Sequence, residues 1–352
     1  WNRPAITRPK TASRLPPPAV TRDGTPVSLR ANTEMLHELR AAKNCGAAGI
    51  GLFRSEFLYF GHPKGHPDMA EQLESYRRLA VEMSPHPVAI RTLDAGSEHV
   101  GIGPDPARQE NPSMGLRGIR LSLSTKSAFR TQIEAILRAS CDGRIEIVLP
   151  MISTVEEIWQ AKALIDSVRA ELRSSVGPAI QAVPVGVMVE VPAAVFSLEV
   201  LAKEVDFLCV GTNDLIQYML AVDRGNPQVA YLFQPLHPSV LHCLNHIARV
   251  AGSLNKPVRI CGEISSNPFY AVLLLGLGYA QLSMNPLSIP TIRKVLREIP
   301  LEDSRRIARK VLTLITSQEI YEYLTGAVSA LIPWDLSAYA REIAPQTEPN
   351  GR

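Results

Sequence analysis

The chain has little of what marks a disulfide-rich, zinc-binding or membrane protein. Its 352 residues include five cysteines, an odd number, and no CxxC pair, so neither a disulfide framework nor a zinc site is indicated. The longest apolar run, residues 269–280, is too short to span a bilayer. A net charge of +3 gives no reason to expect nucleic acid or a membrane surface as a partner. We therefore expect a cytoplasmic protein with reduced thiols.

The two ends of the chain have the composition of linkers. Residues 1–18 contain five prolines and four basic residues but no acidic residue, which is typical of an extended segment. The chain begins at Trp1 and shows no signal peptide, so we expect it to be part of a longer protein. We expect a linker over residues 1–22, one folded unit over 23–330 and a tail over 331–352.

Between the ends, short apolar runs alternate with helical patterns. An apolar fraction of 45% is enough for a large core. Strands that alternate with helices indicate parallel βαβ units, and eight of them in about 270 residues favour a single (β/α)8 barrel of the TIM type. Further helical patterns after residue 302 predict extra C-terminal helices. The expected strands are residues 26–31, 48–53, 87–93, 145–150, 184–189, 205–211, 257–261 and 279–284.

Acidic and amide side chains follow two neighbouring predicted strands. Glu190 comes directly after the run 185–189, and Asn213 and Asp214 come shortly after the run 205–210. The carboxyl ends of parallel strands meet at one rim, so these side chains should lie close together. Two carboxylates there suit Mg²⁺, which takes one or two such ligands and completes its shell with water and substrate phosphate.

Arginines are expected at the same rim. Arg54 and Arg91 lie at the ends of two predicted strands, and Cys261 ends another. Arg117 follows a segment rich in glycine and proline, residues 95–115, and Arg224 comes shortly after Asp214. Guanidinium groups recognise phosphate and carboxylate oxygens through paired hydrogen bonds. The pattern therefore predicts a site for a small, highly anionic, metal-chelated molecule, which we interpret as a phosphorylated acid.

Eight motifs, in order, make the chain resemble the C-terminal domain of the phosphoenolpyruvate–protein phosphotransferase family, Enzyme I. The similarity runs from about Gly24 to Glu302. The motifs LHPSV (236–240) and LSMN (282–285) resemble those of the family's nitrogen-regulatory branch. Many ordered motifs are more specific than any one of them. They are GLFRSEFLYF (51–60), RTLDAG (91–96), ENPSMGLRGIR (110–120), LPMISTVEE (149–157), MVEVPAA (188–194), VGTNDLIQYMLAVDRGN (210–226), CGE (261–263) and LSMNPLSIP (282–290).

The resemblance implies substrate-binding roles. Arg54 and Arg91 match the arginines that hold the phosphate of phosphoenolpyruvate, and Arg224 matches a third substrate-binding arginine. Arg117 is a further candidate, although Arg120 could do its work. Asn213 and the backbone of Asp214 correspond to groups that hold the substrate's phosphate or carboxylate.

The resemblance also implies a metal and a proton donor. Glu190 and Asp214 match the Mg²⁺ ligands, and Cys261 matches the cysteine that protonates C3 of enolpyruvate. The expected reaction converts phosphoenolpyruvate to pyruvate and passes phosphate to a histidine of an N-terminal domain, which serves a small phosphocarrier protein. None of the eight histidines here lies in the family's Ser-His setting, so the acceptor is expected elsewhere. The family also implies a homodimer.

Two segments depart from the family pattern. Residues 97–99 place a histidine where the family has lysine, and residues 264–268 replace a run that ends in Gly-Asp. Neither change removes a residue with an implied role, but both lie in loops that could affect closure or turnover.

Other interpretations stay open. Arg54 and Arg91 could be structural ion-pair partners of nearby acids, Glu190 and Asp214 could be helix caps, and Cys261 could be a structural thiol. The whole chain could instead be the matching domain of pyruvate phosphate dikinase or phosphoenolpyruvate synthase. It could also be a non-catalytic, phosphoenolpyruvate-sensing dimerisation module.

Overall fold

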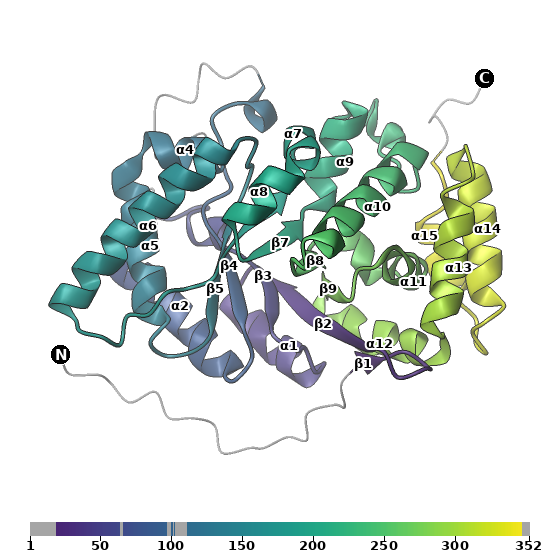
Figure 1. Cartoon of the computed structure of the whole chain (residues 1–352), viewed down its shortest axis with the longest axis horizontal. Coiled ribbons are helices and arrows are strands. Elements are labelled where there is room, and N and C mark those ends of the chain that lie inside the picture. The colour runs from purple at the N-terminus through teal and green to yellow at the C-terminus, as the bar shows by residue number, and fades with distance from the viewer. Residues whose placement is uncertain (1–18, 64–65, 97–99, 101, 103–110, 347–352) are drawn as a thin grey trace.

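Eight parallel strands close into a barrel in the computed structural model of the chain, which describes residues 19–63, 66–96, 100, 102 and 111–346 (Figure 1). Each strand pairs with the next, and the first of the eight also pairs with the last, which completes the ring. The expected (β/α)8 barrel is confirmed. Its strands are β2 (Pro26–Thr33), β3 (Ile50–Arg54), β4 (Val88–Arg91), β5 (Ile145–Leu149), β6 (Val185–Val189), β7 (Phe207–Val210), β8 (Val258–Ile260) and β9 (Gln281–Met284).

Alternate residues of each strand face the helices or the barrel interior. In β5, Ile145, Ile147 and Leu149 belong to the large core shared with the helices, whereas Val148 faces inward. Both faces are buried, which is why these strands are apolar runs and show little polar alternation. The inward-facing apolar and sulfur-containing side chains form what we call the inner layer: Leu52, Ala89, Val148, Met188, Phe207, Cys209 and Cys261.

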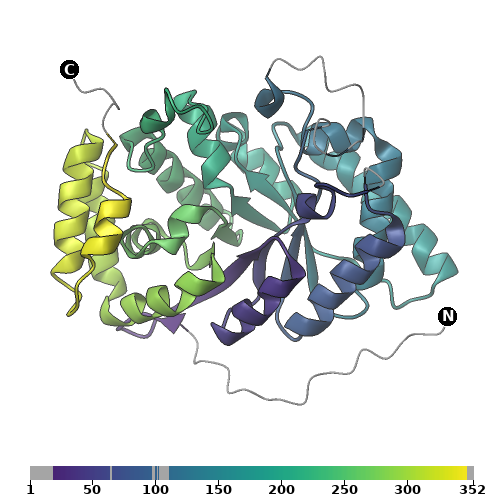
Figure 2. The ribbon, with the colours of Figure 1, turned by 180° about the vertical axis from the view of Figure 1, so that it is seen from behind.

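Helices cover the outside of the barrel (Figures 1 and 2). The connection between β6 and β7 contains two short helices, α7 and α8, which are separated at Ser197. No helix in the described ranges is long and apolar enough to cross a membrane. The helices are α1 (Leu39–Asn44), α2 (Met69–Met83), α4 (Ile119–Ser124), α5 (Lys126–Ala139), α6 (Val155–Ser175), α7 (Pro192–Phe196), α8 (Leu198–Glu204), α9 (Thr212–Leu220), α10 (Pro238–Ser253), α11 (Pro268–Leu277) and α12 (Ile289–Glu298).

Additional elements extend the barrel at both ends of the described chain. Strand β1 (Ala19–Val20) pairs antiparallel with β2, although it lies inside the segment expected as linker. Helices α13 (Leu301–Val311), α14 (Ser317–Ser329) and α15 (Ser337–Glu342) are the expected extra C-terminal helices, and α15 lies inside the expected tail. They gather on one side of the molecule, next to α11 (Figure 2). The boundaries of the linker and the tail stay predictions.

Helix α11 is apolar on nearly all sides because the barrel and the added helices enclose it. It contacts α13 and α14 as well as the elements beside it in the barrel. At Gly276 the backbones of α11 and α13 are so close that a Cβ atom would lie 2.0 Å from the carbonyl oxygen of Ser304. The added helices are therefore packed against the barrel through a contact that admits no side chain.

We expect Gly276→Ala to destabilise the protein, because the Ser304 backbone must move to admit a methyl group. The cost should be about 1–3 kcal/mol in the free energy of unfolding, measured by urea denaturation. Gly252→Ala is the matched control, since Gly252 is an exposed residue in the last turn of α10 and no atom lies within 4 Å of the added Cβ. It should stabilise by about 0.5–1 kcal/mol. Equal effects at both positions would contradict the packing argument.

Candidate active site

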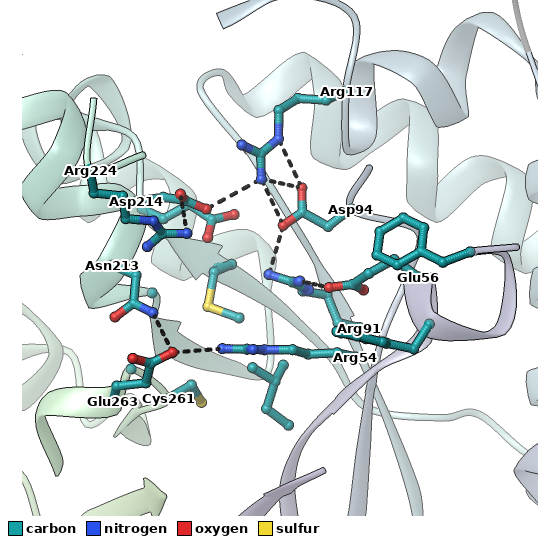
Figure 3. Close-up of a pocket in the computed structure, with 17 residues that line it drawn as sticks. Arg54, Glu56, Arg91, Asp94, Arg117, Asn213, Asp214, Arg224, Cys261 and Glu263 are labelled. Atoms are coloured by element: carbon teal, nitrogen blue, oxygen red, sulfur yellow. Dashed lines mark hydrogen bonds and ion pairs between the residues drawn. The ribbon is translucent and has the colours of Figure 1, made fainter. Parts of the chain in front are cut away.

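A cavity of about 260 Å³ opens at the carboxyl ends of the barrel strands (Figure 3). Every site residue expected from the sequence lines it, so the structure brings together side chains that are up to about 200 residues apart in the chain. Those residues are Arg54, Arg91, Arg117, Glu190, Asn213, Asp214, Arg224 and Cys261. Glu56, Asp94 and Glu263 contribute further charge to the same wall.

Arg91 and Arg117 are largely buried and share one carboxylate, that of Asp94. Arg91 Nη1 lies 2.7 Å from Asp94 Oδ2, and Arg117 Nη2 lies 3.0 Å from Asp94 Oδ1. Burial alone would raise the pKa of Asp94, but the two guanidinium groups, Arg91 first, lower it below its ordinary value. Arg91 also pairs with Glu56, and Arg117 Nη2 lies 3.3 Å from Asp214 Oδ2. These arginines are therefore held rigidly by carboxylates.

The ion pairs of Arg54 and Arg224 are more exposed to solvent than those of Arg91 and Arg117. Arg54 Nη1 lies 2.5 Å from Glu34 Oε1, and its Nη2 lies 3.8 Å from Glu263 Oε1. Arg224 Nη2 lies 3.5 Å from Asp214 Oδ1, and its side chain is 43% exposed. Both guanidinium groups can therefore turn toward an incoming anion with little loss of buried pairing.

Three carboxylates meet at the deep side of the cavity. Oxygen atoms of Asp94, Glu190 and Asp214 all lie within 4.8 Å of one another, and the three residues are buried. Burial, and next the charges of Asp94 and Asp214, raise the pKa of Glu190 well above its ordinary value. Three hard oxygen donors at this spacing fit a divalent cation such as Mg²⁺.

Local structure fixes each of these carboxylates. Asp94 follows β4 and Glu190 follows β6, while Asp214 lies in the first turn of α9. The backbone N–H of Met151 donates a hydrogen bond of 2.7 Å to Glu190 Oε1. The amino end of a helix favours negative charge, which suits Asp214.

Cys261 lies on the floor of the cavity, directly after β8. It is 2% exposed, and its Sγ lies 3.6 Å from the carbonyl oxygen of Gly51. A Cβ atom at the next residue, Gly262, would lie only 1.6 Å from Thr212 Oγ1. The segment that carries the thiol is therefore packed directly against the start of α9, which carries Asp214.

Some residues of the site were not expected from the sequence. The sequence places Asp94 at a strand end together with Arg91, but it does not predict Asp94 as the neighbour of Glu190 and Asp214, because that depends on where β4 and β6 lie in the closed barrel. Tyr218, whose hydroxyl lies 3.4 Å from Arg117 Nη1, was missed as well. Burial raises the pKa of Tyr218 to about 12, so the phenol is neutral at physiological pH.

The two sequence departures have different outcomes. Residues 97–99 lie outside the described part of the chain. Residues 264–268 form the end of a 3₁₀ turn (Glu263–Ser266) and the start of α11, where Asn267 caps the helix by accepting a hydrogen bond from Phe269 N. Ser265 Oγ donates a 2.6 Å hydrogen bond to the carbonyl oxygen of Ser283. This departure therefore forms a well-bonded helix start.

Comparison with known proteins gives consistent matches over most of the chain. The family described as "PEP-utilising enzyme, PEP-binding domain" matches residues 10–301. A phosphoenolpyruvate-protein phosphotransferase of Bacillus sp. (strain S) is 42% identical over 311 residues, covering 88% of this chain and 54% of that protein. Proteins of the same name from Buchnera aphidicola and Haemophilus influenzae are each 38% identical, over 88% and 86% of this chain. The chain spans about half the length of these curated relatives.

We expect Glu190→Gln to stabilise the metal-free protein and to remove its response to Mg²⁺. The raised pKa means that the folded state holds the proton more tightly than the unfolded chain, so ionisation of Glu190 as pH rises costs stability. Glutamine keeps the shape without the charge, so the variant should be more stable than the unmodified protein at neutral pH. The measurement is the melting temperature with and without Mg²⁺.

Exposed Glu199→Gln in α8 serves as the control and should leave both quantities unchanged. Asp214→Asn should also lose the Mg²⁺ response. A full Mg²⁺ response in the Glu190 variant would rule out this carboxylate as a ligand.

Proposed function

Since the chain belongs to the PEP-utilising enzymes through their PEP-binding domain, we propose that it binds phosphoenolpyruvate at the barrel rim and cleaves its phosphate ester within a phosphoenolpyruvate–protein phosphotransferase. The observation that carries the proposal is the convergence of four arginines and three buried carboxylates on one small cavity. Phosphoenolpyruvate has two anionic groups on a three-carbon frame, which match this donor set in size and charge.

The arginines are proposed to bind the substrate. Arg54 and Arg91 would hold the phosphate, with Arg224 and Arg117 completing the cationic wall. Asn213 Nδ2 now donates to Glu263 Oε1 over 3.2 Å and could donate to a phosphate or carboxylate oxygen instead, beside the backbone of Asp214. Charge-assisted hydrogen bonds of this kind supply most of the stabilisation in phosphoryl transfer.

The carboxylates are proposed to hold Mg²⁺. Glu190 and Asp214 would be ligands, with Asp94 available as a third. When bound, the metal would neutralise carboxylate charge and polarise the phosphoryl oxygens. Arg117 and Arg224 both pair with Asp214, and they would be available for the substrate if a bound cation neutralised Asp214 instead.

Cys261 is proposed as the proton donor. When the P–O bond breaks, its electron pair remains on the enolate oxygen, and the Cys261 thiol gives its proton to C3 to form pyruvate. Burial raises the pKa of Cys261, so the group rests as a neutral thiol, as this role requires. The thiolate that remains takes a proton from solvent.

The phosphoryl acceptor is proposed to be a histidine on an N-terminal domain outside this chain, which passes phosphate to a small phosphocarrier protein. We also propose a cytoplasmic homodimer. The relatives named above are phosphotransferases, and nothing in the site favours a dikinase or a synthase. A non-catalytic sensor would have the same pocket and is separated by the experiments below.

Arg224→Ala should weaken binding of phosphoenolpyruvate far more than binding of pyruvate, since pyruvate lacks the phosphate. Loss of one charge-assisted bond costs about 1.5–3 kcal/mol, or roughly 10–150-fold in Kd, measured by calorimetry with Mg²⁺. Exposed Arg173→Ala on α6 is the control and should bind both ligands normally. Absence of phosphoenolpyruvate binding by the unmodified chain would overturn the proposed function.

Cys261→Ala should bind phosphoenolpyruvate and Mg²⁺ nearly as well as the unmodified chain but form pyruvate at least about 100-fold more slowly. The assay is single-turnover pyruvate formation with the N-terminal phosphohistidine domain supplied. Cys243→Ala, a buried thiol of α10, is the matched control. A structural thiol would show the reverse, with a lower melting temperature and an unchanged rate, while a sensor would form no pyruvate even without substitution.

A further inference from the structure

A second set of charges lies inside the barrel, nearer the amino ends of the strands than the cavity. Arg30 of β2, Glu146 of β5 and Arg259 of β8 form what we call the interior charge cluster. Arg30 Nη1 lies 3.0 Å from Glu146 Oε2, and Arg259 Nη1 lies 2.7 Å from the same oxygen. The two arginines therefore share one carboxylate, and the cluster has one more positive charge than negative.

The inner layer separates this cluster from the cavity. Arg259 pairs in register with Cys209 of β7, and Cys261 follows two residues after Arg259, on the same face of the chain. The guanidinium of Arg259 stacks over the ring of Phe207, 4.3 Å from its centroid. Arg259 is thus fixed below both sulfur atoms, since Phe207, Cys209 and Cys261 belong to the same layer.

An uncompensated buried positive charge is costly, and a nearby anion reduces the cost. The other members of the inner layer are leucine, alanine, valine, methionine and phenylalanine, which cannot ionise, so within the described layer only the two thiols can supply that anion. The excess charge of the cluster therefore acts on the thiols.

We propose that Arg259 is a positioning residue for Cys261. The positive charge of Arg259 stabilises the thiolate that forms when Cys261 gives up its proton, and the negative charge of Glu146 partly offsets this effect. Chemically, the S–H bond of Cys261 breaks, a C–H bond forms at C3 of the enolate, and the electron pair stays on sulfur. This role deepens the proposed function and rests on it. Cys209, within hydrogen-bonding reach of Cys261, completes the pair of thiols above Arg259.

The groups that surround Cys261 act in opposing directions. Burial raises its pKa most, and Cys209 raises it further, while Arg259 and Arg30 lower it. On the cavity side, Arg54 and Glu263 line the same pocket and carry opposite charges. Removal of Arg259 should therefore raise the pKa of Cys261, and removal of the Glu146 charge, which offsets the arginines, should lower it.

The experiment measures how fast iodoacetamide alkylates Cys261 in the full 352-residue chain between pH 7 and 9, by mass spectrometry of the Cys261 peptide. Below the pKa, this rate is proportional to the thiolate fraction, so one pKa unit changes it about tenfold. Arg259→Met should slow alkylation by about tenfold or more, and Glu146→Gln should accelerate it by a similar factor. Methionine and glutamine keep most of the packing volume.

Cys243, buried in α10 away from the barrel interior, is the internal control in every digest, and its rate should stay constant. Loosened packing would accelerate alkylation in both variants, so changes of opposite sign can arise only from charge. If Arg259→Met does not fold, Arg30→Met takes its place, because it removes the other positive charge of the cluster and should also slow alkylation. Changes of the same sign, or no change, would overturn the inference.

The assay requires no phosphoenolpyruvate, so its outcome is independent of the proposed function. Normal phosphoenolpyruvate turnover with no alkylation change in the variants rejects only the role of Arg259. Opposite shifts in a chain that does not bind phosphoenolpyruvate would support the electrostatic coupling and reject the reaction assigned to it. Given turnover, Arg259→Met should lower the rate of pyruvate formation more than it changes the Kd for phosphoenolpyruvate.

Discussion

Asp94 forms ion pairs with two arginines, Arg91 and Arg117, and the arrangement of the cavity depends on this shared carboxylate. Arg91 and Arg117 reach it from different segments, and Arg117 continues to Asp214. Buried charges are tolerated only when each has a partner. In this pocket the charged side chains are partners of one another, and these ion pairs keep them in place around the cavity. A ligand that enters must therefore replace protein–protein pairs, which favours molecules that bring both charge signs, such as an anion with its metal. The proposed preference for a metal-bound phosphate ester is consistent with this pairing.

The same constraint operates a second time, deeper in the barrel. There Glu146 is shared by Arg30 and Arg259, with the inner layer between the two charged sets. A TIM barrel normally fills its centre with layers of branched apolar side chains. Here the layer beneath the site is charged, and the only ionisable groups described between the two charged layers are Cys209 and Cys261. The acid of the proposed reaction is thus placed between two electrostatic environments, of which only one contacts the substrate.

Much of this could be predicted from the sequence, for identifiable reasons. Most of the eight strands are largely apolar and are followed by polar residues, and parallel topology places those ends together, so the rim position of the residues from Arg54 to Cys261 follows from the sequence. What could not be predicted depends on register. Arg30, Glu146 and Arg259 look like polar interruptions on the outer face of a strand until the pairing shows that all three point inward. Asp94 likewise becomes a third oxygen donor only when β4 and β6 are placed in the same ring. The break at Ser197 and the short strand β1 are local features that tertiary contacts decide.

The close packing around Gly262 limits which amino acids can replace it. A Cβ atom at residue 262 would lie only 1.6 Å from Thr212 Oγ1, so the loop that carries Cys261 and the helix that carries Asp214 leave no room for a side chain between them. A mutational library that varies residue 262 alone will return almost only glycine, whatever chemistry is selected. Loss of the hydroxyl at 212 removes the closest of these contacts, but an added Cβ at 262 would still lie 2.8 Å from the Cβ of residue 212, so joint variation succeeds only where the backbone also shifts. The effect of a substitution at position 262 therefore depends on which residue occupies position 212.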